Sequence, residues 1–147
     1  MRNLQKNTIS VGCSRKNLKH IRHFVDGHLL DFKVDDINRN LIVLAIDEIC
    51  ANKIIHAHKE NEGDSISLTI NIQQAPTGLI FDIIDTGEAF DPLKYKRTNL
   101  KTLIKEKRKG SLGMVIVSKV MDEVTFRTEN SQNICRLVKF INQPERA

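Results

Sequence analysis

The chain has 147 residues, of which 40% are hydrophobic and 28% charged, and its formal net charge is +5. This length suffices for one compact domain with its own core and is too short for two of ordinary size. No run is long and apolar enough to span a bilayer, and the opening MRNLQKNTIS lacks the apolar centre of a secretory signal. We therefore expect a single domain over residues 1–147, in the cytoplasm and not in a membrane.

The first part of the chain carries one strand pattern and two helix patterns. Residues 7–13 have the alternation of a short strand, and residues 14–30 repeat apolar side chains at helical spacing, with Ser14 able to cap the helix. A second helix is expected to begin near Asp35 or Asp36 and to end before the turn-rich ENEGD.

Three polar residues lie four apart along this second helix: Glu48, Asn52 and His56. Residues at that spacing share one face, and neighbouring apolar residues predict that this face turns inward. Polar groups buried without partners each cost about 1–3 kcal/mol, so a cleft that holds a ligand or metal would explain them. The alternative is that Glu48 turns to solvent and His56 is a packing histidine.

The second half of the chain reads as a series of strands interrupted by one helix. SISLTINI places Ile66, Leu68, Ile70 and Ile72 on one face, and QQAPTG connects it to the apolar run LIFDII, which predicts two antiparallel strands. GSLGMVIVSKVMDEV reads as a glycine loop that enters a helix, and VTFRT and ICRLVKFI form a hairpin around ENSQN. The expected fold is α+β, with consecutive antiparallel strands packed under helices on one face.

The positive charge is concentrated in one segment. Residues 94–109 contain eight basic residues and one acid, a net charge of +7, which leaves the rest of the chain at −2. Such a run is most often a solvated loop or helix face, but between DTGEAFDP and GSLG it could also close over a polyanion. Nucleic-acid binding is not favoured, because Tyr95 is the only aromatic residue in the run.

Cysteine and histidine usage does not favour a disulfide or a metal site. Cys13, Cys50 and Cys135 are few, far apart and set in apolar segments, which predicts buried free thiols. His20 and His23 lie three apart on a predicted helix, but no carboxylate or thiol accompanies them at a recognised metal-binding spacing.

Two glycine-containing motifs complete the pattern. Asp85 directly follows a buried strand and precedes Gly87, where the backbone must turn sharply. Gly110 and Gly113 frame GSLG ahead of an apolar helix, and the free N–H groups at a helix start suit phosphate. Each motif alone is weak, because an Asp-x-Gly turn and a glycine before a helix are both common.

The motifs follow one another along the chain in the order Glu48-x-x-x-Asn52, DTGEAFDP, a basic segment, GSLGM and MDEV. With these motifs in this order, the chain resembles the ATP-binding domain shared by gyrase, Hsp90, histidine kinases and MutL. Its layout is most similar to the bacterial anti-sigma-factor serine/threonine kinases. The resemblance covers nearly the whole chain. It implies a two-layer α/β sandwich of the Bergerat type, with a mixed, mostly antiparallel sheet, helices on one face and a basic lid at about residues 92–109.

The resemblance also implies roles for individual residues. Glu48 would act as general base, Asn52 would coordinate Mg²⁺, and Asp85 would accept a hydrogen bond from the adenine amino group. Lys53 stands where a small residue is usual, so its cation would either reach phosphate or face solvent. The nucleotide-binding positions implied are Asn52, His56, Asp85, Gly87, Ala89 (where a second glycine is common), Gly110, Ser111, Leu112 and Gly113.

The resemblance further implies an ATP- and Mg²⁺-dependent anti-sigma factor that phosphorylates a serine or threonine of an antagonist protein, and so takes part in bacterial transcription regulation. Its expected partners are a sigma factor, the antagonist and a second copy of the chain. About 40 residues precede the Glu48 helix, too few for the helical pair that carries the phosphorylated histidine in histidine kinases. The alternative is an ATP-sensing protein-binding module of the same fold with negligible catalysis.

Overall fold

The computed structural model describes residues 7–86 and 109–141, except for the side chains of residues 109–112. A 3₁₀ turn (Arg15–Asn17) precedes the first helix, and a π-helical turn (Lys53–Ala57) follows the second. In chain order the helices and strands are β1 (Thr8–Gly12), α1 (Leu18–Asp31), α2 (Asp36–Asn52), β2 (Ser65–Gln74), β3 (Thr77–Asp85), α5 (Lys109–Val120), β4 (Glu123–Glu129) and β5 (Gln132–Phe140).

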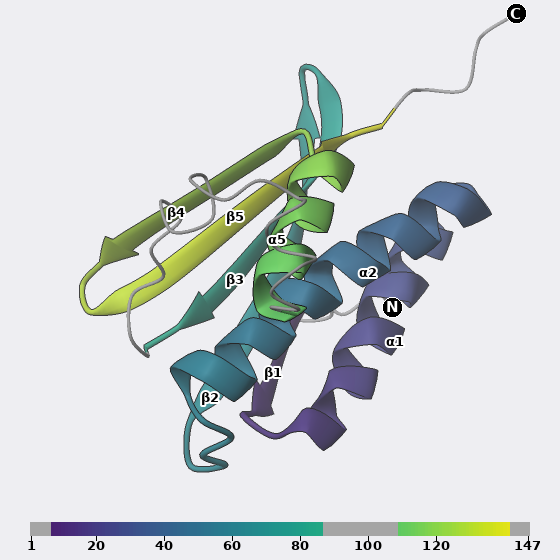
Figure 1. Ribbon diagram of the computed structural model, residues 1–147. Helices are drawn as coiled ribbons and strands as arrows, with labels where there is room; N and C mark the ends of the chain where they lie inside the picture. Colours follow the sequence, from purple (N-terminus) through teal and green to yellow (C-terminus); the bar gives the residue numbers. More distant parts are fainter. Residues whose placement is uncertain (1–6, 87–108, 142–147) are drawn as a thin grey trace, which may run out of the picture.

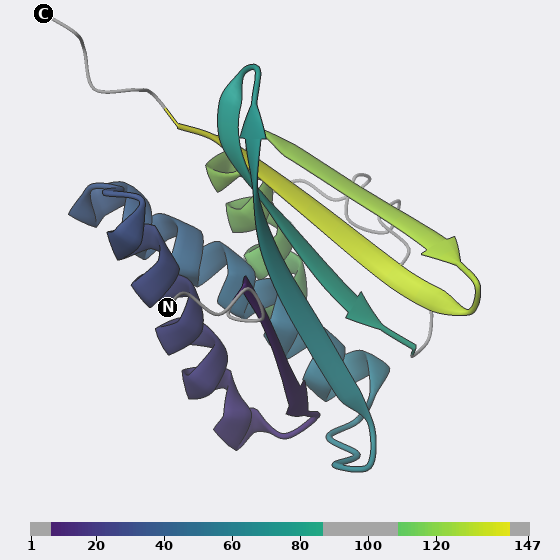
Figure 2. The ribbon, with the colours of Figure 1, turned by 180° about the vertical axis from the view of Figure 1, so that it is seen from behind.

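The strands form one five-stranded sheet in the order β1-β2-β3-β5-β4, and each of the four pairings is antiparallel. Helices α1, α2 and α5 lie on one side of this sheet (Figure 1). The view from behind shows the opposite face without a helix from the described part of the chain (Figure 2). The α+β fold with two layers and helices on one face is thereby confirmed.

The core lies between the sheet and the three helices. Phe81 on the central strand β3 is fully buried and pairs with Ile70 of β2 on one side and Leu137 of β5 on the other. Ile46 and Ile49 of α2 face the same core. Because β3 has a neighbouring strand on each side, its end at Asp85 is held firmly in place.

Two local expectations are wrong. Ser14 makes no side-chain capping bond, because the intervening 3₁₀ turn moves the start of α1 to Leu18. Ile72 is 49% exposed, whereas the other three apolar residues of its strand are buried. The reason is that the tip of the β2–β3 hairpin extends beyond the helical layer (Figure 1).

The three cysteines are free and buried, as the sequence predicts. Within residues 7–86 and 109–141, no helix is long and apolar enough to cross a membrane. The same residues contain no cluster of histidine, cysteine and acidic side chains that could hold a metal ion, and His20 and His23 are both exposed.

Candidate functional site

The predicted polar face of α2 is only partly inward. Glu48 and Asn52 are half-buried on it, but His56 is exposed, as is Leu41 at the other end of the same stripe. The α-helix ends at Asn52 and a π-helical turn follows, which has more residues per turn and breaks the four-residue spacing. The inward position predicted for His56 is therefore wrong, and the buried histidine is His58.

Glu48 lies where α2 packs against α5. A Cβ placed on Gly113 of α5 would come within 2.9 Å of Glu48 Cδ and 3.2 Å of Cγ, and would collide with the carboxylate oxygen. Only glycine at position 113 leaves room for this side chain in its present position. Burial, with a smaller contribution from the charge of Asp47, raises the pKa of the Glu48 carboxyl above its usual value. A raised pKa makes this carboxylate a stronger base than one in water.

The glycine motif forms a helix and not a loop ahead of one. Helix α5 begins at Lys109, so Gly110, Ser111, Leu112 and Gly113 all lie inside its first turns. The loop expected before the helix is therefore wrong, although an anion site is still compatible with this geometry. The first four N–H groups of a helix have no acceptor within it. In α5 these groups belong to the first turn, which is followed directly by Gly113, the residue that contacts Glu48.

Asn52 is one helical turn beyond Glu48, about 6 Å along the axis. Its amide nitrogen Nδ2 is buried and has no hydrogen-bond partner within the described part of the chain. A buried amide donor without a partner costs about 1–3 kcal/mol, which a ligand oxygen would recover. An amide also offers an oxygen, the ligand type that Mg²⁺ prefers, so Asn52 fits a metal-bound phosphate.

Asp85, at the end of β3, is held by two cationic or proton-donating side chains. Lys53 Nζ lies 2.7 Å from its Oδ1, and His58 Nε2 lies 2.7 Å from its Oδ2. The Asp85 side chain is 0% exposed and that of Lys53 is 7% exposed. Lys53 thus neither reaches toward phosphate nor faces solvent as the sequence suggested, but forms a buried ion pair with Asp85.

His58 continues this set of contacts to a second carboxylate. Its Nδ1 is 2.9 Å from Asp64 Oδ2, in the loop before β2. Burial lowers the pKa of His58, but the hydrogen bonds and charges of Asp64 and Asp85 outweigh it and raise the pKa above its ordinary value. We name the side chains of Asp64, which is partly exposed, and of the buried His58, Asp85 and Lys53 the charge network. Two carboxylates and two cationic groups make it neutral when His58 is protonated.

These contacts bring distant parts of the sequence together. Gly113 of α5 meets Glu48, and Lys53, which directly follows Asn52, meets Asp85. The predicted residues Glu48, Asn52, Asp85 and Gly113 therefore lie in one region, at the carboxyl end of α2 and the end of β3. Gly87, Ala89 and the proposed lid up to residue 108 lie outside the described residues.

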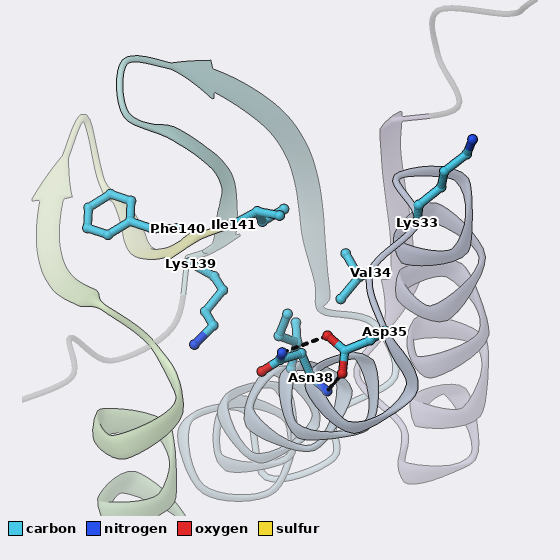
Figure 3. A pocket seen from close by; sticks show the side chains of 8 residues that line it. Lys33, Val34, Asp35, Asn38, Lys139, Phe140 and Ile141 are labelled. Atoms are coloured by element: carbon cyan, nitrogen blue, oxygen red, sulfur yellow. Dashed lines mark hydrogen bonds between the residues drawn. The ribbon is translucent and has the colours of Figure 1, made fainter. Parts of the chain in front are cut away.

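A separate pocket lies at the other end of α2. It has a volume of about 290 Å³, and Val34, Asn38 and Ile42 contribute to it together with Lys139 and Ile141 of the opposite wall. Figure 3 shows Asp35 turned onto Asn38, with which it caps the helix. Between Asn38 and Asn52 the helix rises by about 21 Å, so this pocket is distinct from the region of Glu48.

The fold and the site together define an α+β domain in which an acid and an amide on one helix lie beside the start of another. The family model described as "Histidine kinase-like ATPase domain" matches residues 14–139. This chain belongs to that family.

Curated relatives with similar sequences carry the name serine-protein kinase RsbW. The protein from Bacillus licheniformis is 24% identical over 121 residues, which is 78% of this chain and 71% of the relative. The protein from Staphylococcus aureus (strain JH9) is 29% identical over 69% of this chain and 65% of its own length. The Bacillus subtilis (strain 168) protein is 24% identical over 67% of this chain and 62% of its own length. The chain thus spans about two thirds of these relatives.

Solved structures support the fold. The RsbU and RsbW domains of a Mycobacterium tuberculosis protein match with a TM-score of 0.61 and 14% identity, over 95% of this chain and 33% of that one. A chain of the SiaB-SiaC complex from Pseudomonas aeruginosa matches with a TM-score of 0.59 and 12% identity, over 91% of this chain and 89% of that one.

Proposed function

We propose that this protein binds Mg·ATP and transfers the γ-phosphoryl group to a serine or threonine of a partner protein. The observation that carries the proposal is the packing of Glu48 against Gly113, which sets a basic carboxylate beside the free amides of a helix start. Membership of the ATPase family and relatives named serine-protein kinases support the same reaction.

In the proposed reaction, Glu48 takes the proton from the acceptor hydroxyl as its oxygen bonds to the γ-phosphorus and ADP leaves. The free amides at the start of α5, among them those of Gly110 and Ser111, hold phosphate oxygens. Asp85 lies on the side of the base, with Gly87 and Ala89 following it in sequence. Asn52 would hold Mg²⁺, which when bound would neutralise charge on the phosphates. His56, exposed one π-turn further, is assigned to the rim of the nucleotide site.

The proposed biological role is that of an anti-sigma factor controlled by an antagonist, which is the phosphoryl acceptor. The support is the resemblance to the RsbW serine-protein kinases, together with a structural neighbour that was solved in complex with a second protein. A sigma factor and a second copy of the chain are the other proposed partners, and the basic segment at about 92–109 is the proposed lid. The cytoplasm is the proposed location.

Calorimetric titration of Mg·ATP tests the nucleotide site. We expect roughly micromolar binding by the wild type and at least about 10-fold weaker binding by Asn52→Ala. The substitution removes a buried donor that has no partner in the described structure, so it should not destabilise the fold. Asn40→Ala is the matched control, because Asn40 is exposed near the other end of the same helix. Absence of binding by the wild type would refute the proposal.

Transfer is tested separately from binding. With γ-labelled ATP and candidate antagonist proteins, label should move to a serine or threonine of one of them, and Glu48→Gln should abolish transfer while it retains ATP binding. ATP binding with no transfer to any candidate would instead favour the ATP-sensing module. If Glu48→Gln transferred the phosphoryl group as well as the wild type, Glu48 would not be the general base.

A further inference from the structure

The buried ion pair of Lys53 and Asp85 is not required by the proposed chemistry. Lysine is rarely buried unless it is paired, and here the ammonium lies 2.7 Å from Asp85 Oδ1 with only 7% of its side chain exposed. His58 takes the other carboxylate oxygen at 2.7 Å. Both oxygens of Asp85 therefore face N–H donors that belong to the protein itself.

This arrangement bears on how the site would read a nucleotide base. Under the proposed function, the exocyclic amine of adenine donates a hydrogen bond to Asp85. The Lys53 ammonium is also an N–H donor, carries a full charge, and already contacts that carboxylate. Because the Asp85 side chain has no exposed surface, an amine that reached it would have to displace Lys53 or share the oxygen with it.

We propose that Lys53 is a specificity-determining residue that occupies the base-reading carboxylate Asp85, so that the purine's exocyclic amine contributes little to affinity. The inference rests on the proposed function and extends its ligand from ATP to purine nucleotides that lack the 6-amino group. A hydrogen bond to an uncontested charged group is ordinarily worth about 10- to 100-fold in affinity. When the amine only replaces the ammonium as donor, most of this gain is lost.

The decisive measurement compares ATP with purine riboside triphosphate, which lacks the exocyclic amine, in calorimetric titrations of the wild type with Mg²⁺. We expect the two dissociation constants to agree within about 3-fold, against the roughly 10- to 100-fold of an uncontested hydrogen bond. A preference for ATP of 10-fold or more in the wild type would overturn the proposal. If neither nucleotide binds, the proposed function itself is wrong and this inference falls with it.

Substitution of Lys53 should reveal the suppressed preference. In Lys53→Met, the ratio of the two dissociation constants should rise to at least about 10-fold in favour of ATP. ATP binding should not weaken, although a positive charge has been removed near a polyanion. Lys119→Met, which removes an exposed charge from α5, should leave the ratio unchanged.

A second variant guards against misfolding, because Lys53→Met leaves Asp85 with one partner fewer. Lys53→Gln keeps a neutral donor to Asp85 and should give an intermediate ratio; both variants are checked by thermal unfolding. A ratio in the folded variants equal to that of the wild type would show that Lys53 is only structural, and the proposal would be wrong.

Discussion

The missing Cβ of Gly113 is what permits the position of the Glu48 carboxylate. The atoms that an added Cβ would meet belong to the end of a flexible side chain, so the side chain can move away while the helices stay in place. Alanine also favours a helix over glycine by roughly 0.5–1 kcal/mol. Stability and catalysis should therefore respond to this substitution in opposite directions.

We predict that Gly113→Ala retains or slightly increases the free energy of unfolding and lowers ATP turnover by at least about 10-fold, because a misplaced catalytic group costs that much or more. Denaturant unfolding and ADP release measure the two effects. Gly27→Ala in α1 is the control, because a Cβ there meets nothing within 4 Å. It should gain similar helix stability and leave turnover unchanged; equal turnover by Gly113→Ala would contradict the prediction.

At this scale the sequence predicts some site residues and misses others. Glu48 and Asn52 were predictable because the helix is regular as far as Asn52, so their spacing has structural meaning. The roles of Lys53 and His58 were not predictable, because both residues come after the regular α-helix changes to a π-helical turn. No residue pattern in KIIHAH indicates this change. Asp64 was read only as part of a turn, since its partner depends on where His58 points.

Among the elements, the β4–β5 hairpin turns through two left-handed residues, Asn130 with φ 51° and Ser131 with φ 67°. This is the backbone of the two-residue hairpin turns, whose favoured sequence is Asn-Gly. Asparagine tolerates the left-handed region, but serine does so at a cost. The turn is therefore one place where the sequence is not optimal for the fold.

We predict that Ser131→Gly raises the free energy of unfolding by about 1 kcal/mol, because it removes the left-handed penalty of a residue with a Cβ. Chemical denaturation measures the change. Ser10→Gly, on the extended strand β1, is the matched control and should instead lower stability by roughly 0.5–1 kcal/mol. A loss of stability in Ser131→Gly would show that the serine side chain contributes more than its backbone strain.

Strands β1 and β2 were predictable from alternation, because the sheet buries one face against the helices and leaves the other without a helix in the described structure. Strand β3 was predictable as an apolar run, since it is buried along most of its length. The start of α5 was not, because GSLG suits a loop as well as a helix. The packing of α5 on α2 favours the helical conformation of GSLG. This packing could not be predicted from local sequence, because it brings together Glu48 and Gly113, which are 65 positions apart.

At the scale of the whole molecule, the charge network fastens three segments together: the turn after α2, the loop before β2 and the end of β3. Its protonation is therefore linked to global stability. His58 has a folded pKa above its ordinary value of 6.5, so between these two values the folded protein binds more protons than the unfolded chain. The resulting stabilisation is full below pH 6.5 and is lost as pH rises through the folded pKa.

We predict that the free energy of unfolding falls as pH rises above about 6.5, with a slope of at most about 1.4 kcal/mol per pH unit from this group. Urea unfolding at a series of pH values measures the slope. His58→Gln should remove this component, whereas His56→Gln, at an exposed histidine two residues earlier, should retain it. If the free energy of unfolding of His58→Gln fell with pH at the same slope as that of the wild type, the effect would belong to another group.

The π-helical turn also affects how this chain is to be aligned with its relatives. A turn that is wider than α-helical holds an additional residue, so a relative that continues α2 as a regular helix is matched correctly only with a one-residue gap after Asn52. Without that gap, His58 and its counterpart would be paired about 100° apart around the helix axis. For the same reason, a chain with one residue deleted from Lys53–Ala57 should still form the helix but direct His58 away from Asp85.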